Sequence, residues 1–291
     1  MNIVSLARQA KHALHVRRKH LKWRLRPVKI KAYDRWRANN PDRKPYVYHE
    51  DQYPHTFLRR PTPATRPAQS VPRRIFVIWV GNTPMNPRRA ESLESIRQAQ
   101  TDVEVVLIDE ISWTDWIVTE GPIHHAFGLL SPVHRSDYMR AYLMHFHGGG
   151  YCDIKPLSSD WGRLFDTLND HPDVWAIGYR EVTSEYTPDL PHALGADVKR
   201  HYKSVFGPSA FIFRPCTPFT EEWWRELSSR MDYYASALRE SPGGDPYNPP
   251  GSYPIRWTEI LGDITQPLCL KHQQHIRFDD TVRPRLKDYR A

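Results

Sequence analysis

The residues best suited to chemistry lie in one segment, residues 134–156. Asp137 and Arg140 stand three positions apart on a helix that we expect to run from Ser136, as its N-cap, to His147. At about 100° per residue, the carboxylate and the guanidinium share one side of this helix. The apolar residues share the other side: Met139, Tyr142, Leu143 and Phe146. A surface ion pair has the same spacing and is worth only about 0.2–0.5 kcal/mol, so the pair alone favours that simpler interpretation.

The residues after this helix favour a binding site instead. The three glycines at 148–150 accept the positive φ that a helix end needs. Residues 151–154 then predict a short strand that brings Asp153 to its end. Because glycine lets a ligand approach the backbone closely, we expect Gly149 and Asp153 to lie at a site whose wall is the charged side of the helix.

Two apolar strands with a helix between them predict where this site lies. Residues 75–80 and 103–108 are apolar runs of strand length, and residues 87–100 have helical spacing. This βαβ unit predicts an α/β fold with a mostly parallel central sheet flanked by helices, in which ligands bind outside the carboxyl ends of the strands. Three candidate binding residues end the first strand: Trp79, Val80 and Gly81. The glycine patterns of dinucleotide-binding and P-loop enzymes are absent from the sequence, which argues against both classes.

The C-terminal part continues the α/β pattern. Strands are expected at 174–177 and 210–213, and a long amphipathic helix at 220–239 with Thr220 as its N-cap. The aromatic residues of this helix have the spacing of a core face: Trp223, Trp224, Tyr233 and Tyr234. A segment flanked by proline and glycine around Trp257 is a candidate lid over a bound ligand.

Three of these segments resemble a known family. The pattern Ser-Asp-x-x-Arg at 136–140, followed by Gly-Gly-x-Tyr-x-Asp at 148–153, resembles the donor-sugar segment of glycosyltransferases with the GT-A fold. The likeness is to the family 32 type, which includes yeast initiating mannosyltransferases, capsular polysaccharide synthesis proteins and glucosylating clostridial toxins. Residues 72–81 resemble the first strand of that family, and residues 211–219 its strand-then-helix segment. The resemblance implies a Rossmann-like nucleotide-sugar transferase domain over residues 72–291.

The resemblance also implies roles for single residues. Trp79 matches the residue that stacks on the nucleotide base, and Asp153 the first aspartate of the Asp-x-Asp motif, which contacts the donor and helps to organise a metal. Three residues match those that hold the ribose and the transferred sugar: Ser136, Asp137 and Arg140. Aspartate and arginine side chains suit donor binding, because carboxylates and guanidinium groups bind sugar hydroxyls and phosphates through strong hydrogen bonds.

Lys155 stands where that family has its second aspartate, the main protein ligand of Mg²⁺ or Mn²⁺. An ammonium group only donates hydrogen bonds and cannot bind a cation, so this residue argues for a weakened or absent metal requirement. In one account, Lys155 lies against the donor diphosphate and neutralises part of its charge. In the other, Asp153 keeps the metal with the help of Asp263 or His272.

The net charge of +8 has its origin in an N-terminal arm. Residues 1–45 hold fourteen Lys and Arg against two Asp, whereas the rest of the chain holds 27 basic and 31 acidic residues. Residues 3–14 have the spacing of an interfacial helix, so the arm is either a membrane-surface anchor or a solvated tail. No nucleic-acid partner is expected, because the body adds no basic patch. The proline-rich residues 46–71 are expected to form a linker or to drape over the domain.

The resemblance implies a glycosyltransferase of capsular or cell-surface polysaccharide synthesis. The resemblance implies a UDP- or GDP-sugar donor, a glycan or lipid-linked glycan acceptor and retention of the anomeric configuration. Three scattered cysteines and the lack of an 18-residue apolar run fit a cytoplasmic enzyme, peripheral at the inner face of the membrane. The competing hypothesis is a scaffold that binds a nucleotide sugar or carbohydrate and has lost turnover.

Overall fold

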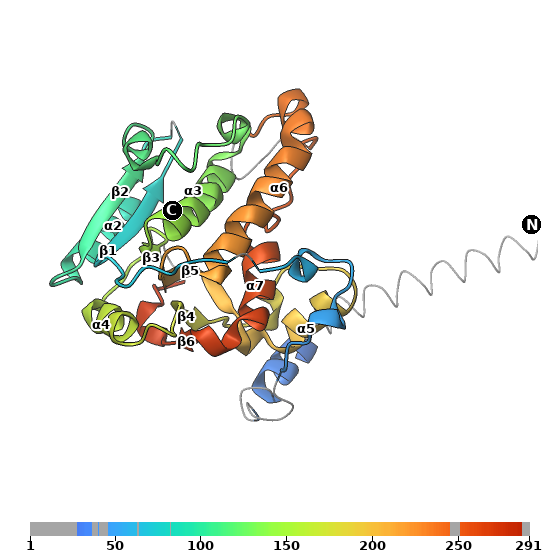
Figure 1. The fold of residues 1–291 in the computed structure, drawn as a ribbon. Helices are drawn as coiled ribbons and strands as arrows, with labels where there is room; N and C mark the ends of the chain where they lie inside the picture. Colours follow the sequence, from blue (N-terminus) through green and yellow to red (C-terminus); the bar gives the residue numbers. More distant parts are fainter. Residues whose placement is uncertain are drawn as a thin grey trace, which may run out of the picture.

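A computed structural model describes residues 28–36, 40, 46–62, 64–81, 83–244 and 251–286. Its described residues form one six-stranded sheet in the order β2-β1-β3-β5-β4-β6. The strands are β1 Arg74–Trp79, β2 Glu104–Asp109, β3 Gly149–Cys152, β4 Ala176–Arg180, β5 Phe206–Phe213 and β6 Ile276–Phe278. Five strands run in the same direction, and β5 is antiparallel to its neighbours β3 and β4. The predicted α/β class is confirmed, with a mixed sheet (Figure 1).

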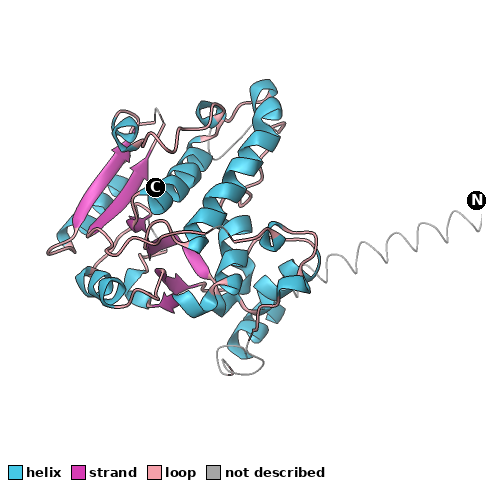
Figure 2. Ribbon diagram, in the orientation of Figure 1, coloured by secondary structure: helices cyan, strands magenta, loops and turns pink. Residues whose placement is uncertain are grey.

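Helices cover both faces of the sheet (Figure 2). They are α2 Pro87–Gln98, α3 Pro132–Phe146, α4 Gly162–Asp170, α5 His192–Arg200, α6 Pro218–Glu240 and α7 Gly262–Lys271. Alternate residues of β1 point to opposite faces, as the period of a strand requires. Ile75 and Val77 pack in the core with α2 and α4. Phe76 and Ile78 pack in the core with α3, α6 and α7, which explains why β1 is apolar throughout.

Short 3-10 turns join these elements. They are η1 Glu50–Gln52, η2 Phe57–Arg59, η3 Ser112–Trp116, η4 Phe127–Leu129, η5 Ser184–Tyr186, η6 Tyr202–Ser204, η7 Gln273–His275 and η8 Asp280–Val282. A helix over residues 28–36 precedes them. No helix within the described ranges is long and apolar enough to cross a membrane.

Helix α3 begins one turn earlier than the sequence suggested. Its N-cap is Ser131, whose side chain accepts a hydrogen bond from the His134 amide, and Pro132 occupies the first helical position. The prediction of Ser136 as N-cap was wrong because Ser131-Pro132 is the stronger start signal. The longer helix is also more buried than an amphipathic pattern implies, and both Asp137 and Arg140 lie inside the protein. The interpretation of this pair as a surface ion pair is therefore excluded.

Similar differences occur further along the chain. Helix α6 begins after Thr217, which exchanges capping hydrogen bonds with Thr220, so Thr220 lies in the first turn and is not the N-cap. Strand β4 begins two residues later and ends three residues later than predicted, and β5 begins four residues earlier, because their pairing extends beyond the apolar core of each run. Trp223 is buried as expected, but Tyr233 is 79% exposed, so the core stripe of α6 does not include it.

The segment from residue 46 to 62 packs on the domain that we expected to begin at residue 72. Tyr46, Tyr53 and Leu58 are buried in the same core cluster as α6 and α7. The Tyr53 hydroxyl donates to the Asp197 carboxylate of α5 at 2.9 Å, which anchors the segment. The predicted interfacial helix lies outside the described residues, but the later helix over 28–36 reaches the domain, where the Thr183 hydroxyl donates to Asp34 at 2.7 Å.

We predict that Leu58→Ala lowers the free energy of unfolding by about 2–5 kcal/mol, because it removes a buried side chain and leaves a cavity. Val47→Ala, in the same segment but with Val47 59% exposed, serves as the matched control and is expected to change stability by about 0.5 kcal/mol or less. Urea unfolding followed by tryptophan fluorescence measures both. Equal midpoints for Leu58→Ala and the unmodified protein would show that the segment is only a linker.

Candidate functional site

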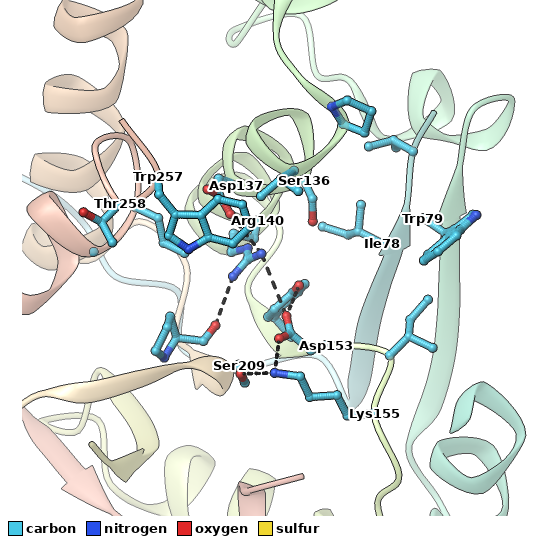
Figure 3. Close-up of a pocket in the computed structure, with 18 of the residues that line it drawn as sticks. Ile78, Trp79, Ser136, Asp137, Arg140, Asp153, Lys155, Ser209, Trp257 and Thr258 are labelled. Atoms are coloured by element: carbon cyan, nitrogen blue, oxygen red, sulfur yellow. Dashed lines mark hydrogen bonds and ion pairs between the residues drawn. The ribbon is translucent and has the colours of Figure 1, made fainter. Parts of the chain in front are cut away.

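A cavity of about 720 Å³ opens beyond the carboxyl ends of β1 and β3 (Figure 3). From β1 the chain passes through α2 to β2 on one side, and then returns through α3 to β3 on the other side of β1. This reversal of strand order separates the loops that follow β1 and β3, and ligands of open α/β sheets bind at such a point. The cavity thus lies at the carboxyl ends of the strands, where the sequence predicts the site.

An ion pair from α3 forms one wall of this cavity. The Arg140 Nη2 atom lies 3.0 Å from Asp137 Oδ1, and Arg140 Nη1 donates to the carbonyl of Pro208 at 3.0 Å. Only 4% and 8% of the Asp137 and Arg140 side chains are exposed. Burial raises the pKa of Asp137 against the opposing attraction of Arg140 and His134. Asp137 is therefore easier to protonate than a surface aspartate.

Asp153 is held between two cations at the end of β3. Its Oδ2 lies 2.8 Å from Lys155 Nζ, while its Oδ1 accepts from the Tyr151 hydroxyl at 2.6 Å and lies 3.9 Å from Arg140 Nη2. Burial would raise the pKa of this carboxyl, but Lys155 and Arg140 outweigh burial and lower the pKa to about 2. Asp153 is thus ionised at neutral pH.

Lys155 is placed by the chain around it. The Lys155 amide donates to the Asp153 carbonyl at 2.7 Å, and this tight turn brings the two side chains together. The Lys155 ammonium also donates to the Ser209 hydroxyl at 2.7 Å. Ser209 lies beside Asp153 because β5 pairs with β3, and the Asp153 amide donates to the Ser209 carbonyl at 2.7 Å. No local signal in the sequence indicates this contact across 54 residues.

The residues that end β1 line the cavity as expected. The Trp79 indole is fixed by a hydrogen bond from Nε1 to the carbonyl of Thr83 at 2.9 Å. Gly81 has a φ of +122°, a conformation that strains any other residue, and its amide donates to Glu110 at 2.8 Å. Val80 lies between them, and Ser136 lines the cavity from α3.

Gly149 is not at the cavity, so its prediction as a binding residue was wrong. Its φ is +98°, and a Cβ there would lie 2.9 Å from the backbone oxygen of Arg74. A Cβ at Gly150 would lie 2.9 Å from the Trp161 ring. These glycines allow β3 to pack closely against β1 and Trp161, so they serve packing and not ligand approach.

The two C-terminal candidates for a metal site lie in other interactions. Asp263 pairs with Arg256 at 2.7 Å, and His272 Nε2 lies 3.3 Å from Glu222, whose other oxygen pairs with Lys271. Neither Asp263 nor His272 lines the cavity, so the structure does not bring them to Asp153. Within the described ranges, no group of three or more His, Cys, Asp and Glu side chains is placed to hold a metal ion.

The charged residues that line the cavity come from a different part of the chain than many of its uncharged ones. All charged lining residues come from the chain before residue 156: Arg89, Asp137, Arg140, Asp153 and Lys155. The later lining residues carry no charge: Tyr186, Pro208, Ser209, Trp257, Thr258, Leu261, Gly262 and Gln266. Trp79 and Trp257 lie on opposite sides of Asp153 (Figure 3). Sequence reasoning missed Arg89, Tyr186 and Ser209, because each reaches the cavity only through tertiary packing.

Trp257 was expected in a lid, and it does lie at the cavity. Its segment is held by Arg256, which pairs with Glu259 and Asp263 at 2.7 Å each. Trp257 is 59% exposed, and Tyr186 is 61% exposed. Two large aromatic side chains are thus available at the cavity for a ligand.

Comparisons with protein-family models, with curated proteins and with solved structures find no match for this chain.

We predict that the free energy of unfolding of Asp153→Asn falls less steeply between pH 6 and pH 2 than that of the unmodified protein. The pKa of about 2 lies below the ordinary value of 3.8, so ionised Asp153 stabilises the fold above pH 4, and this contribution is lost as the pH falls through 2. Between pH 6 and pH 2, the free energy of unfolding of the unmodified protein should fall by about 2 kcal/mol more than that of the variant. Urea titrations across this range measure the difference.

The matched control for this experiment is Asp170→Asn, which changes an exposed carboxylate of α4. It should follow the pH dependence of the unmodified protein. The same pH dependence in Asp153→Asn would contradict the stabilising role of the charges around Asp153.

Proposed function

We propose that this protein is a glycosyltransferase of the GT-A type, which transfers a sugar from a nucleotide-diphosphate sugar to a hydroxyl of a glycan acceptor. The observation that carries the proposal is one cavity lined both by a cluster of charged side chains, Asp137, Arg140, Asp153 and Lys155, and by the exposed aromatic side chains Tyr186 and Trp257. The mixed α/β sheet is compatible with this fold type. Two of the three segments that resemble the family line the cavity, with Trp79 from the first and Ser136, Asp137, Arg140 and Asp153 from the second.

The charged lining residues and Trp79 suit the donor. The flat face of Trp79 is available to a nucleotide base, and Arg89, Arg140 and Lys155 supply positive charge for a diphosphate. The Asp137 and Asp153 carboxylates and the Ser136 hydroxyl are acceptors for ribose and sugar hydroxyls. A cavity of about 720 Å³ lies in the range of sites for ligands of this size.

The exposed aromatic lining residues suit the acceptor. Tyr186 and Trp257 expose aromatic faces to the cavity, and such faces cover the apolar C–H faces of a pyranose ring. The lack of charge among the lining residues after residue 156 favours a neutral sugar over an acidic one. We therefore assign the neutral end of a glycan to the part of the cavity at Tyr186 and Trp257.

The proposed reaction depends on position and charge. The bond between the anomeric carbon and the diphosphate oxygen breaks, and the acceptor oxygen forms a bond to that carbon on the same face. The electron pair of the broken bond stays with the diphosphate, where the buried cations Arg140 and Lys155 stabilise it, and the acceptor proton passes to the leaving diphosphate. The cavity holds donor and acceptor next to each other, which lowers the entropic part of the activation free energy.

We predict that purified protein transfers or hydrolyses the sugar of a UDP- or GDP-sugar. Asp137→Asn and Asp153→Asn should each lower turnover on the order of 100-fold or more, because each changes the charge around the reacting centre. Tyr233→Ala, at an exposed residue of α6 outside the cavity, is the control and should keep full turnover. Nucleotide release from a panel of donors and glycan acceptors measures all three.

Tight donor binding with no turnover on that panel would contradict the enzymatic proposal and favour the scaffold hypothesis. Near-ultraviolet circular dichroism separates loss of turnover from loss of fold, since the variants Asp137→Asn and Asp153→Asn change buried or partly buried groups.

The acceptor assignment gives a separate prediction. Tyr186→Ala and Trp257→Ala should each raise the KM for the acceptor about tenfold and leave the Kd of the donor nucleotide within twofold, because aromatic contacts of this kind are worth about 1–2 kcal/mol. Steady-state kinetics with varied acceptor, together with nucleotide titrations, measure the two effects. A loss of nucleotide affinity with an unchanged acceptor KM would place these residues on the donor side.

A further inference from the structure

The Asp153 carboxylate already has a cation, and this observation bears on how the proposed donor is bound. Lys155 Nζ lies 2.8 Å from Asp153 Oδ2, and the other carboxylate oxygen accepts from the Tyr151 hydroxyl at 2.6 Å. Both Asp153 oxygens therefore have partners from the chain itself. The inference below rests on the proposed function, because it concerns the diphosphate of the proposed donor.

The residues around Asp153 do not fit a divalent metal. Mg²⁺ and Mn²⁺ bind oxygen ligands and take one or two carboxylates together with phosphate oxygens. The other carboxylate of the cavity, Asp137, pairs with Arg140 at 3.0 Å. A divalent ion at Asp153 would have to displace the Lys155 ammonium or lie beside it, where like charges repel.

We propose that the Lys155 ammonium, held by Asp153 and Ser209, replaces the divalent cation and binds the diphosphate of the donor. Arg140, 3.9 Å from Asp153, supplies a second buried positive charge in the same cluster. When the bond to the anomeric carbon breaks, its electron pair and negative charge pass to the diphosphate, beside these cations. Donor binding and transfer are then independent of divalent ions.

The position of Lys155 distinguishes it from an ordinary surface lysine. It is buried, and Ser209 fixes the ammonium at 2.7 Å from the serine hydroxyl. Ser209 is itself placed by the Asp153 amide, which donates to its carbonyl, so β3 and β5 hold the cation together. A preorganised charge of this kind stabilises a leaving group without rearrangement during the reaction.

Nucleotide titrations by calorimetry test the proposal with UDP, UMP, GDP and GMP in EDTA and in Mn²⁺. For the unmodified protein, we expect the diphosphate to bind at least tenfold more tightly than the monophosphate, with Kd values within twofold in the two buffers. Lys155→Met should remove the preference for the diphosphate, and Lys155→Arg should keep most of it. Diphosphate binding by the unmodified protein that requires Mn²⁺ would overturn the proposal.

Two further variants keep the test valid if Lys155→Met does not fold. Ser209→Ala keeps the ammonium but removes its hydroxyl partner, so the diphosphate preference should fall severalfold with no change for the monophosphate. Lys155→Asp places a second carboxylate beside Asp153. Electron paramagnetic resonance should then detect protein-bound Mn²⁺ in this variant with UDP or GDP but not in the unmodified protein. Equal Mn²⁺ binding by both proteins would contradict the proposal.

These outcomes separate the two proposals. Sugar transfer that requires Mn²⁺ would overturn the role of Lys155 and leave the glycosyltransferase proposal in place. Metal-independent diphosphate binding without any transfer would support the role of Lys155 and contradict the enzymatic proposal. No binding of any tested nucleotide would overturn both.

Discussion

The charge balance at the end of β3 is the constraint on which the site depends. Asp153, Lys155, Arg140 and Asp137 lie within one network, and their side chains are buried or nearly so. A buried charge without a partner is costly, so each member needs the others. Two carboxyl groups face two cations, so each buried charge has an opposite partner nearby. The network therefore stabilises the site and prepares it for an anionic ligand.

The rest of the fold keeps this network in place. Helix α3 carries Asp137 and Arg140 in its buried middle, where packing on α6 and β1 fixes their direction. The glycines of β3 permit close contact of β3 with β1 and Trp161, and this packing positions the end of β3, which Asp153 follows. Antiparallel β5 places Ser209 beside Lys155. The charged binding groups thus come from a helix that packs on the sheet and from the tight turn that follows β3, and Ser209 of β5 supports them, which suits a site that must be preorganised.

The sequence predicts the parts of this arrangement that depend on local pattern. Strand or helix periodicity predicts the apolar run at β1, the start of α2 and the spacing of Asp137 and Arg140. These features place Asp137 and Arg140 at the cavity. Predictions failed where a stronger local signal was overlooked, as at Ser131-Pro132, or where a glycine serves packing, as at Gly149. Ser209, Tyr186 and Arg89 could not be predicted, because only the pairing of distant strands and the packing of loops bring them to the cavity.

A crystal structure with the more tightly bound of UDP or GDP, prepared in the presence of Mn²⁺, tests the central claim most directly. The account predicts the base on Trp79, the diphosphate within hydrogen-bond distance of Lys155 Nζ, and no metal ion between Asp153 and the phosphates. A nucleotide bound outside this cavity, or a diphosphate bound to Asp153 through a metal with Lys155 turned away, would contradict it.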